Sequence, residues 1–215
     1  MTSYIPILLD CEERPCLVVG GGMIAERKTR SLLEAKAMIT IISPQLTQGL
    51  FMLYETNRIQ WIPRAFTEGD TVGYWLVHVT TDQEATNLQI AEEAKLNGIP
   101  VNVASHGEMG TFINPAVMRR GRLTIAVSTD GAGPTVAKSL CKNLDEAYGD
   151  EYECYLDFLH LMRLEIKKRV ESPEQRHKLF RSLAQQPILE DIRRGAFREW
   201  NNTEIEQWIV NHKEA

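Results

Sequence analysis

The 215-residue sequence predicts an α/β protein: a Rossmann-like, doubly wound parallel sheet, followed by a small α+β region and a C-terminal helical domain. Three observations lead to this prediction. Short apolar runs alternate with helical patterns up to residue 113, which is typical of parallel sheets. Glycines 20–22 directly follow the first run, and only helical patterns remain after about residue 150. We therefore divide the chain into residues 1–113, 114–147 and 148–215.

Five strands are expected in the first part. The run CLVV (16–19) is apolar throughout, as expected of a strand that is buried on both faces of a sheet. The later strands are expected within ITIIS (39–43), RIQWIP (58–63), YWLVHVT (74–80) and IPVNVA (99–104). Ligands of such sheets bind at the carboxyl ends of the strands, so the residues that follow each run are candidate site residues.

Two helices are expected between these strands. In MIAERKTRSLLEAKA (23–37), apolar Ala25, Leu32 and Leu33 fall on one side of a helix, as expected when that side faces a sheet. The second helix is expected in DQEATNLQIAEEAKLNG (82–98), with Asp82 as its N-cap and Gly98 past its end.

The pattern changes after residue 113. The stretch LTIAVSTDGAGPTVAKSLCKNLDEAYG (123–149) predicts one strand, a glycine-proline turn and a helix from about Thr135. Farther on, CYLDFLHLMRLEIKKRV (154–170) carries apolar residues at helical spacing, which indicates a core face or a dimer seam.

Charge is distributed unevenly along the chain. The net charge is −5 overall, but residues 114–142 carry five basic groups and one acid. A net acidic chain is poorly suited to general nucleic-acid binding, whereas a short basic stretch suits a small polyanion or a solvated face.

No apolar stretch is long enough for a membrane helix, and the N-terminus lacks a signal-peptide pattern. Without CxxC spacing, the four cysteines indicate free thiols of a cytoplasmic protein.

The glycine turn carries the main chemical signal. Gly20, Gly22 and Ala25 fit G-x-G-x-x-A between a strand and a helix, a spacing that lets a dinucleotide pyrophosphate approach the helix N-terminus. The same glycines also suit a purely structural turn. At the end of the second strand, Ser43 and Pro44 stand where an acid usually binds the ribose hydroxyls, so this spacing does not distinguish NAD from NADP.

Several stretches taken in order resemble the precorrin-2 dehydrogenase family, which includes the N-terminal part of siroheme synthase. They are YIPILLDCEERPCLVVGGGMIAERK (4–28), TTDQEATN (80–87), IPVNVAS (99–105) and FINPAVMRRGRLTIAVSTDGAGPTVAK (112–138), followed by the helical tail. The resemblance covers nearly the whole chain and implies a homodimer, with the middle region serving dimerisation. It also implies that NAD⁺ takes a hydride from precorrin-2, a tetrapyrrole with eight carboxylates, to give sirohydrochlorin for sirohaem or cobalamin biosynthesis.

The resemblance also implies site residues. It places NAD at the glycine turn, at the ends of the second and fourth strands, and beside the fifth: Gly20, Gly22, Met23, Ile24, Ala25, Ser43, Pro44, Thr80, Thr81, Asn102 and Val103. For the anionic substrate, the basic stretch and the turn that leads into a helix N-terminus suggest Arg119, Arg120, Ser128, Thr129 and Lys138. The alternatives are dimer-interface pairing for the arginines and turn chemistry for the two hydroxyls.

The sequence departs from the family at the candidate base. Many members carry an aspartate just after the V-N-V-x stretch, where this chain has Ser105, followed by His106. Both are candidate catalytic residues, and His106 is chemically the better base because its unperturbed pKa lies near neutrality. Histidines and cysteines form no metal-binding spacing, so we expect no metal site. The resemblance also implies that some members insert ferrous iron into sirohydrochlorin, a step that needs a base close to the ring centre. Because Ser105 stands at the aspartate position, we expect little or no ferrochelatase activity.

Two other functions stay open at this stage. A non-catalytic carrier or redox sensor would bind NAD and a tetrapyrrole without turnover, and Ser105 is the feature that favours it. A dehydrogenase of another small anion would also use the glycine turn, but it has no need of the ordered stretch FINPAVMRRGRLTIAVSTDGAGP (112–134).

Overall fold

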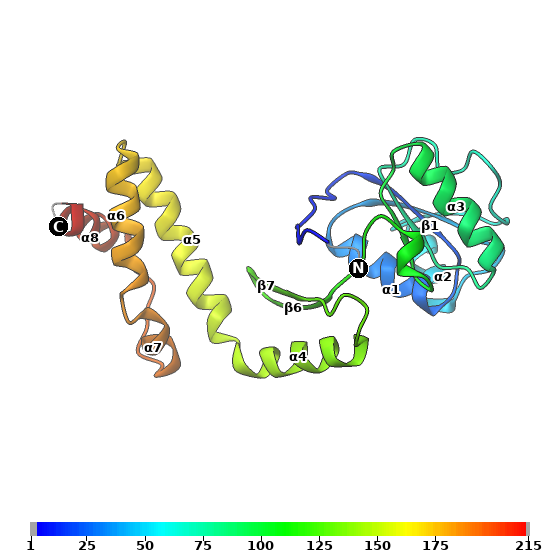
Figure 1. The fold of residues 1–215 in the computed structure, drawn as a ribbon. Coiled ribbons are helices and arrows are strands. Elements are labelled where there is room, and N and C mark those ends of the chain that lie inside the picture. The colour runs from blue at the N-terminus through cyan, green and yellow to red at the C-terminus, as the bar shows by residue number, and fades with distance from the viewer. Residues whose placement is uncertain (1–3, 214–215) are drawn as a thin grey trace. The chain divides into compact units, whose positions relative to one another are not determined.

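A computed structural model describes residues 4–213 of the chain (Figure 1). The chain forms two compact units, divided between Asn114 and Pro115. This boundary lies one residue from the predicted one at 113/114. The finer division of the second part at residue 147 stays a prediction.

The first unit contains a five-stranded, fully parallel sheet. Its strands are β1 (Pro15–Val19), β2 (Met38–Ile42), β3 (Gln60–Ile62), β4 (Leu76–Val79) and β5 (Val101–Val103), in the spatial order β3-β2-β1-β4-β5. The order reverses between β1 and β4, so the end of β1 lies at the switch point where such sheets bind ligands. All five expected strands are present, and the predicted fold class is confirmed.

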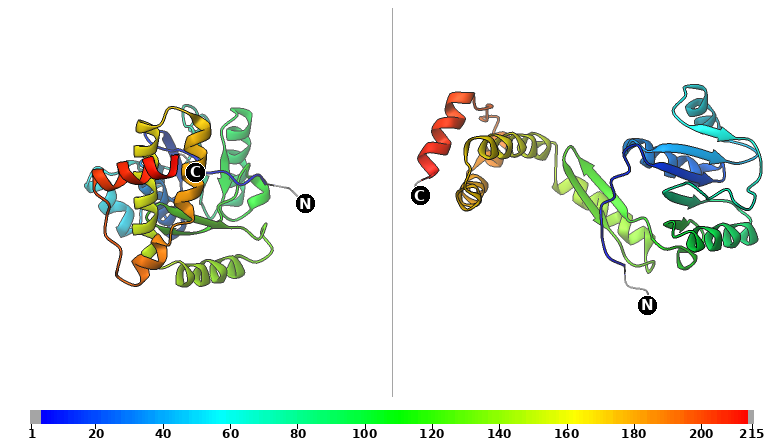
Figure 2. Two further views of the ribbon diagram at one scale, coloured as in Figure 1. Left: turned by 90° about the vertical axis from the view of Figure 1, so that its left-hand side faces the viewer. Right: turned by 90° about the horizontal axis from the view of Figure 1, so that it is seen from above.

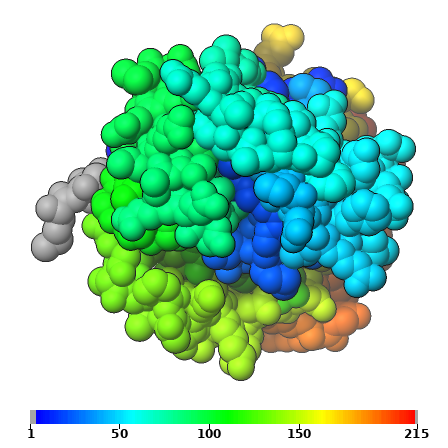
Figure 3. Space-filling view, turned by 90° about the vertical axis from the view of Figure 1, so that its right-hand side faces the viewer, coloured from blue at the N-terminus to red at the C-terminus, as the bar shows by residue number. Residues whose placement is uncertain are grey.

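Helices cover both faces of this sheet. α1 (Met23–Glu34) and α2 (Gln48–Glu55) pack with Cys16, Val18 and Ile41 on one face, and α3 (Glu84–Leu96) packs on Leu17 and Val19 on the other. Successive residues of β1 therefore enter opposite cores, which is why the whole run CLVV is apolar. In Figure 3 this unit faces the viewer, and a blue surface from the early part of the chain is exposed between cyan and teal atoms of later segments.

Two expectations for these helices were wrong or incomplete. α2 was not predicted, because its eight residues, QGLFMLYE, form a short, largely apolar run, which by itself does not distinguish a helix from a strand. The predicted N-cap of α3 at Asp82 is wrong, since the helix begins at Glu84 after Gln83. No side chain caps α3, and Thr81 Oγ1 accepts the Gln83 amide at 3.2 Å in the turn before the helix.

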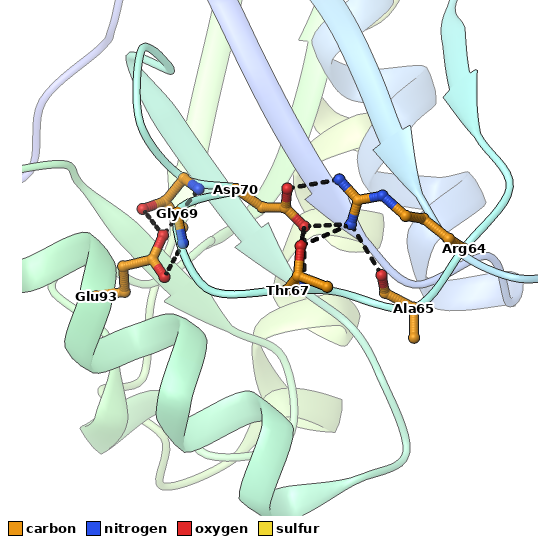
Figure 4. A network of polar contacts seen from close by, with 7 residues as sticks. Arg64, Ala65, Thr67, Gly69, Asp70 and Glu93 are labelled. Carbon is orange, nitrogen blue, oxygen red and sulfur yellow. Dashed lines mark hydrogen bonds and ion pairs between the residues drawn. The ribbon is translucent and has the colours of Figure 1, made fainter.

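The connection from β3 to β4 contains no helix and is held by two carboxylates (Figure 4). Asp70 accepts two 2.6 Å bonds from the Arg64 guanidinium, and Glu93 of α3 accepts the amides of Gly69 and Thr71, each at 2.9 Å. The Arg64 guanidinium lowers the pKa of Asp70. Burial opposes ionisation of Glu93, but bonds from Thr71 and Gly69 outweigh it and lower its pKa. Two ionised carboxylates thus order a loop that forms no helix or strand.

The second unit begins with an antiparallel hairpin. β6 (Ala116–Arg120) pairs with β7 (Leu123–Val127), and α4 (Pro134–Ala147) lies along the hairpin (Figure 2). β7 and α4 agree with the sequence prediction, whereas β6 was not predicted. Its sequence, AVMRR, ends in two arginines, and only Met118 among its side chains is buried, so the apolar signal is weak.

The remaining helices share one core. They are α5 (Glu151–Arg169), α6 (Pro173–Ala184), α7 (Ile188–Arg193) and α8 (Asn202–Lys213). Met162, Ile166 and Val170 are buried among them, so the predicted apolar stripe is a core face. Over residues 4–213, no helix combines the length and apolar character that a membrane crossing requires.

Candidate cofactor site

The three glycines after β1 have different structural roles. Gly20 has φ +117°, and a Cβ there would lie 2.5 Å from Thr80 Oγ1. A Cβ on Gly21 would lie 1.8 Å from the Gln45 carbonyl oxygen. Both glycines are therefore required by the packing of the protein itself. A Cβ on Gly22 would meet nothing within 4 Å, so the chain's own packing does not explain this glycine.

The helix α1 begins directly after this third glycine. Gly22 is the N-cap and provides no side-chain cap, and Glu26 N donates to Gly22 O at 3.0 Å. The amides of Met23 and Ile24 lie in the first turn, where a helix has no internal acceptors, and both residues are exposed. Open space, first-turn amides and the positive end of the helix dipole fit a pyrophosphate at this position.

Thr47 joins the segment after β2 to the glycine turn. Its amide donates to Gly21 O at 2.9 Å, and its hydroxyl donates to Glu26 Oε2 at 2.6 Å. The same hydroxyl accepts Leu50 N as the N-cap of α2. Hydrogen bonds from Thr47 and Arg30 lower the pKa of Glu26, so this carboxylate stays ionised near neutral pH. One threonine thereby holds the glycine turn, α1 and α2 together.

Ser43 and Pro44 end β2 beside this turn. Ser43 is buried, its hydroxyl donates to Gln45 O at 2.7 Å, and its carbonyl accepts Trp61 Nε1 at 2.9 Å. The Ser43 hydroxyl lies close to Gly21: a Cβ added to Gly21 would be 2.7 Å from Ser43 Oγ. The position that usually carries a ribose-binding acid is therefore occupied by a small hydroxyl with a local partner.

The end of β4 brings Thr80 and Thr81 to the same edge. The Thr80 hydroxyl donates to Val19 O at 2.8 Å, which fastens β4 to the end of β1. The Thr81 hydroxyl contacts Asn87 Oδ1 at 2.5 Å, and Asn87 Nδ2 donates back to Thr81 O at 3.0 Å. This reciprocal pair fixes the turn into α3.

Asn102 and Val103 have buried side chains. Asn102 Nδ2 donates to Phe112 O at 3.0 Å, so its Oδ1 is the acceptor facing His78 Nδ1 at 3.2 Å. Val103 belongs to the core under α3. If these two residues contact a cofactor, they do so through the backbone at the end of β5.

His78 is buried behind this edge, and the half-buried Lys28 influences it. Burial and the Lys28 charge lower the pKa of His78 to about 3, so its ring is neutral and donates from Nδ1. Burial and the neighbouring Arg27 charge lower the pKa of Lys28 to about 8. Lys28 Nζ donates to Asn114 Oδ1 at 2.6 Å, which ties α1 to the last residue of the first unit.

The candidate base residues follow β5. Ser105 is exposed, His106 is half-buried, and Ser105 Oγ lies 3.1 Å from His106 Nδ1. They precede a short 3₁₀ helix, Gly107–Met109. The contact lets the serine hydroxyl orient the imidazole ring.

The substrate candidates lie on the hairpin and on α4. Arg120 binds Asp145 and Asp150 at 2.8 Å each and also donates to Tyr148 O. Arg119 and Lys138 are exposed. Ser128 Oγ accepts Asp130 N, and Thr129 Oγ1 accepts Gly133 N. Arg120 is thus engaged within its own unit, and both hydroxyls already have turn partners.

Sequence reasoning missed Thr47, Glu26 and Asn87. Thr47 gave a weak signal, a threonine just before an unpredicted helix, and its partner Glu26 is 21 residues away. Asn87 closes the stretch TTDQEATN, but its bond to Thr81 needs the helical turn to form. Within residues 4–213, no group of three or more histidine, cysteine, aspartate or glutamate residues is placed to hold a metal ion.

The fold and the glycine turn define a dinucleotide-binding protein of the Rossmann class. A family model described as "Putative NAD(P)-binding" matches residues 7–116. The chain belongs to this NAD(P)-binding family.

Curated relatives and a solved structure extend the comparison. The siroheme synthase of Thioalkalivibrio sulfidiphilus is 33% identical over 87% of this chain and 38% of its own length, and that of Methylobacillus flagellatus is 34% identical over 89% and 41%. The chain therefore spans about two fifths of the curated relatives it matches. A structure described as "SirC, precorrin-2 dehydrogenase" superposes with a TM-score of 0.78 and 25% identity, covering 99% of this chain and 100% of that one. The family resemblance predicted from the sequence is confirmed.

Proposed function

We propose that this protein is an NAD-dependent dehydrogenase that oxidises precorrin-2 to sirohydrochlorin in sirohaem or cobalamin biosynthesis. The observation that carries the proposal is Gly22, the N-cap of α1, where an added Cβ would meet nothing within 4 Å and the missing side chain leaves room at the helix N-terminus. The NAD(P)-binding family match and the likeness to a precorrin-2 dehydrogenase over the whole chain support the reaction.

The first unit holds the cofactor through its backbone. Gly20, Gly22, Met23, Ile24 and Ala25 receive the pyrophosphate at the start of α1. The adenosine side lies at Ser43 and Pro44, and the nicotinamide side lies at Thr80, Thr81, Asn102 and Val103. NAD⁺ supplies the hydride acceptor, while the chain orients it and fixes its surroundings.

The proton released in the oxidation needs an acceptor. His106 is the better candidate because an imidazole is a stronger base than a hydroxyl, and Ser105 Oγ lies 3.1 Å from its Nδ1. Ser105 then serves to orient the ring. An unactivated serine is a poor metal ligand and a poor base, so we propose little or no ferrochelatase activity.

The second unit supplies the groups for a polycarboxylate. Arg119 and Lys138 are exposed and are the stronger candidates to bind substrate carboxylates. Arg120 serves first to hold Asp145 and Asp150. Ser128 and Thr129 shape the turn before α4, whose N-cap Gly133 provides no side-chain cap.

A homodimer and a cytoplasmic location are part of the proposal. A two-stranded hairpin is marginal alone, and Val117 on β6 and Val136 and Leu140 on α4 are exposed apolar side chains. Pairing with a second copy through residues 114–147 would cover them, leaving 148–215 as a helical domain. All four cysteines are free thiols, which supports a reducing compartment.

An anaerobic assay of the purified chain with precorrin-2 and NAD⁺ tests the function. We expect NADH and the sirohydrochlorin spectrum to rise together. If the tetrapyrrole binds and neither signal rises, the chain is a carrier or redox sensor, the second candidate that Ser105 favours. If NADH forms only with another small anion, the substrate assignment is wrong.

The candidate base has its own test. His106→Ala is expected to lower kcat about tenfold or more with an unchanged affinity for NAD, because the ring accepts a proton and does not hold the cofactor. Ser105→Asp is the companion variant and should raise the rate if a carboxylate at this position can act as the base. An unchanged rate in His106→Ala would indicate that water or the substrate's own carboxylates accept the proton.

A further inference from the structure

Ser43 and Pro44, which directly follow β2, offer a ribose phosphate neither an acid that repels it nor a cation that binds it. Ser43 is buried, and its hydroxyl and carbonyl are both bonded to neighbours. Dinucleotide enzymes usually discriminate at this position, with an acid for the 2′-hydroxyl of NAD or an arginine for the 2′-phosphate of NADP. A serine performs neither task, so the basis of selectivity must lie elsewhere.

Arg64 is the first charged residue after β3, the strand next to β2. It stands two residues past β3, and β3 is hydrogen-bonded to β2, with Ser43 N donating to Ile62 O at 3.3 Å. Neighbouring strands are only about 4.8 Å apart. The side chain of an arginine that follows β3 can therefore reach the segment that follows β2.

The Arg64 guanidinium is bound within its own loop, the segment between β3 and β4. Figure 4 shows it directed at the Asp70 carboxylate, with Thr67 alongside. It donates to both Asp70 oxygens at 2.6 Å, to Ala65 O at 3.0 Å and to Thr67 Oγ1 at 3.1 Å. Asp70 also accepts Thr67 N at 2.8 Å. A bidentate pair with added bonds is among the strongest arrangements open to an arginine.

We propose that Asp70 determines cofactor selectivity by holding Arg64 away from the ribose end of the site, so that NADP finds no cation there and NAD is preferred. This inference rests on the proposed function and names a residue basis for its cofactor. Asp70 does not touch the cofactor: it acts through Arg64. The Asp70 side chain is only 12% exposed, against 42% for Arg64, and it also accepts the amide and the hydroxyl of Thr67. The loop therefore fixes the carboxylate, and the carboxylate holds the guanidinium.

The test is a gain of NADP binding. Affinities of the full chain for NADH and NADPH are measured by nucleotide fluorescence, which needs no tetrapyrrole. In Asp70→Asn, Arg64 is released, and the preference for NADH over NADPH is expected to fall at least tenfold through stronger NADPH binding. Adding Arg64→Gln to Asp70→Asn should abolish this gain.

A matched control comes from the same loop. Glu93→Gln weakens the carboxylate that holds Gly69 and Thr71 but leaves the Arg64–Asp70 pair in place. It should lower stability without changing the NADH/NADPH ratio. A loosened loop by itself therefore cannot imitate the expected result.

Three outcomes overturn the inference. An unchanged NADH/NADPH ratio in folded Asp70→Asn would do so, as would equal binding of both nucleotides by the wild type. If Asp70→Asn does not fold, Pro44→Arg supplies a free cation at the end of β2 with the pair intact. No gain of NADPH binding in that variant would contradict the proposal. Failure of the wild type to bind either nucleotide would instead overturn the proposed function.

Discussion

The two units place their functional residues by different means. In the first unit, β1 is buried on both faces, and the glycine turn is held by backbone contacts to Gln45 and Thr80. In the second unit, the hairpin buries only Met118 among its strand residues, and Arg120 and Arg122 are paired with acids of their own unit. The candidate cofactor site is thus built on a core, whereas the candidate substrate residues lie on a surface that covers little apolar area.

This difference indicates how substitutions should act. At the glycine turn, a methyl group added to Gly21 would collide with backbone atoms, whereas one added to Gly22 would enter the space proposed for a ligand. On the hairpin, a lost charge removes a contact without disturbing a core. Effects should therefore be large and separable in the first unit and smaller in the second.

Gly21→Ala is expected to have the largest effect. A Cβ there lies 1.8 Å from a backbone oxygen that cannot move without displacing the segment after β2. We expect a loss of about 3 kcal/mol or more in the free energy of unfolding. Urea unfolding followed by circular dichroism measures this loss, and near-wild-type stability would show that the glycine turn can accommodate a methyl group at Gly21.

Gly22→Val should separate binding from folding. Its Cβ meets nothing in the chain, so the unfolding free energy should change by less than about 1 kcal/mol. The side chain fills the space proposed for the pyrophosphate, so NADH affinity should fall about 100-fold, with a smaller fall in Gly22→Ala. Wild-type NADH binding by folded Gly22→Val would contradict the placement of the cofactor.

The hairpin cations should divide into binding and structural groups. Arg119→Gln with Lys138→Gln is expected to raise KM for precorrin-2 about tenfold, since two exposed cations no longer meet carboxylates. Arg120→Gln should lower the melting temperature and leave KM nearly unchanged, because its guanidinium is bound to Asp145 and Asp150. The reverse pattern in steady-state kinetics and thermal unfolding would exchange these roles.

Acid should remove a small part of the first unit's stability. The pKa values of Glu26, Asp70 and Glu93 are lowered in the folded protein, so their contribution is present above the unfolded values and is lost as the pH falls through the folded ones. At pH 7, Glu93→Gln should be about 1 kcal/mol less stable than wild type. Unfolding measured from pH 7 to 3 should show this gap closing below about 4.5, the ordinary value for glutamate. A gap that stays constant would exclude the ionised carboxylate as its source.

Several features of the site were predictable because their signals are local. An apolar run, glycines and a helical period lie within one stretch of 28 residues and predict the strand, the turn and α1. The ends of β4 and β5 are equally local. β6 and α2 escaped prediction because they are short and their burial depends on neighbours elsewhere in the chain.

The sequence by itself determined the class of this protein. It predicted a parallel sheet with a glycine turn after its first strand, and it carries sequence motifs in the same order as precorrin-2 dehydrogenases. Tertiary structure alone decided which glycine serves packing and which leaves room for a ligand, since the deciding atoms belong to Gln45 and Thr80. It also decided that Arg120 and Arg64 are held by acids, while Arg119 is exposed. The physical reason is the same in each case: a side chain's role depends on the atoms around it, and those come from positions that no local pattern connects.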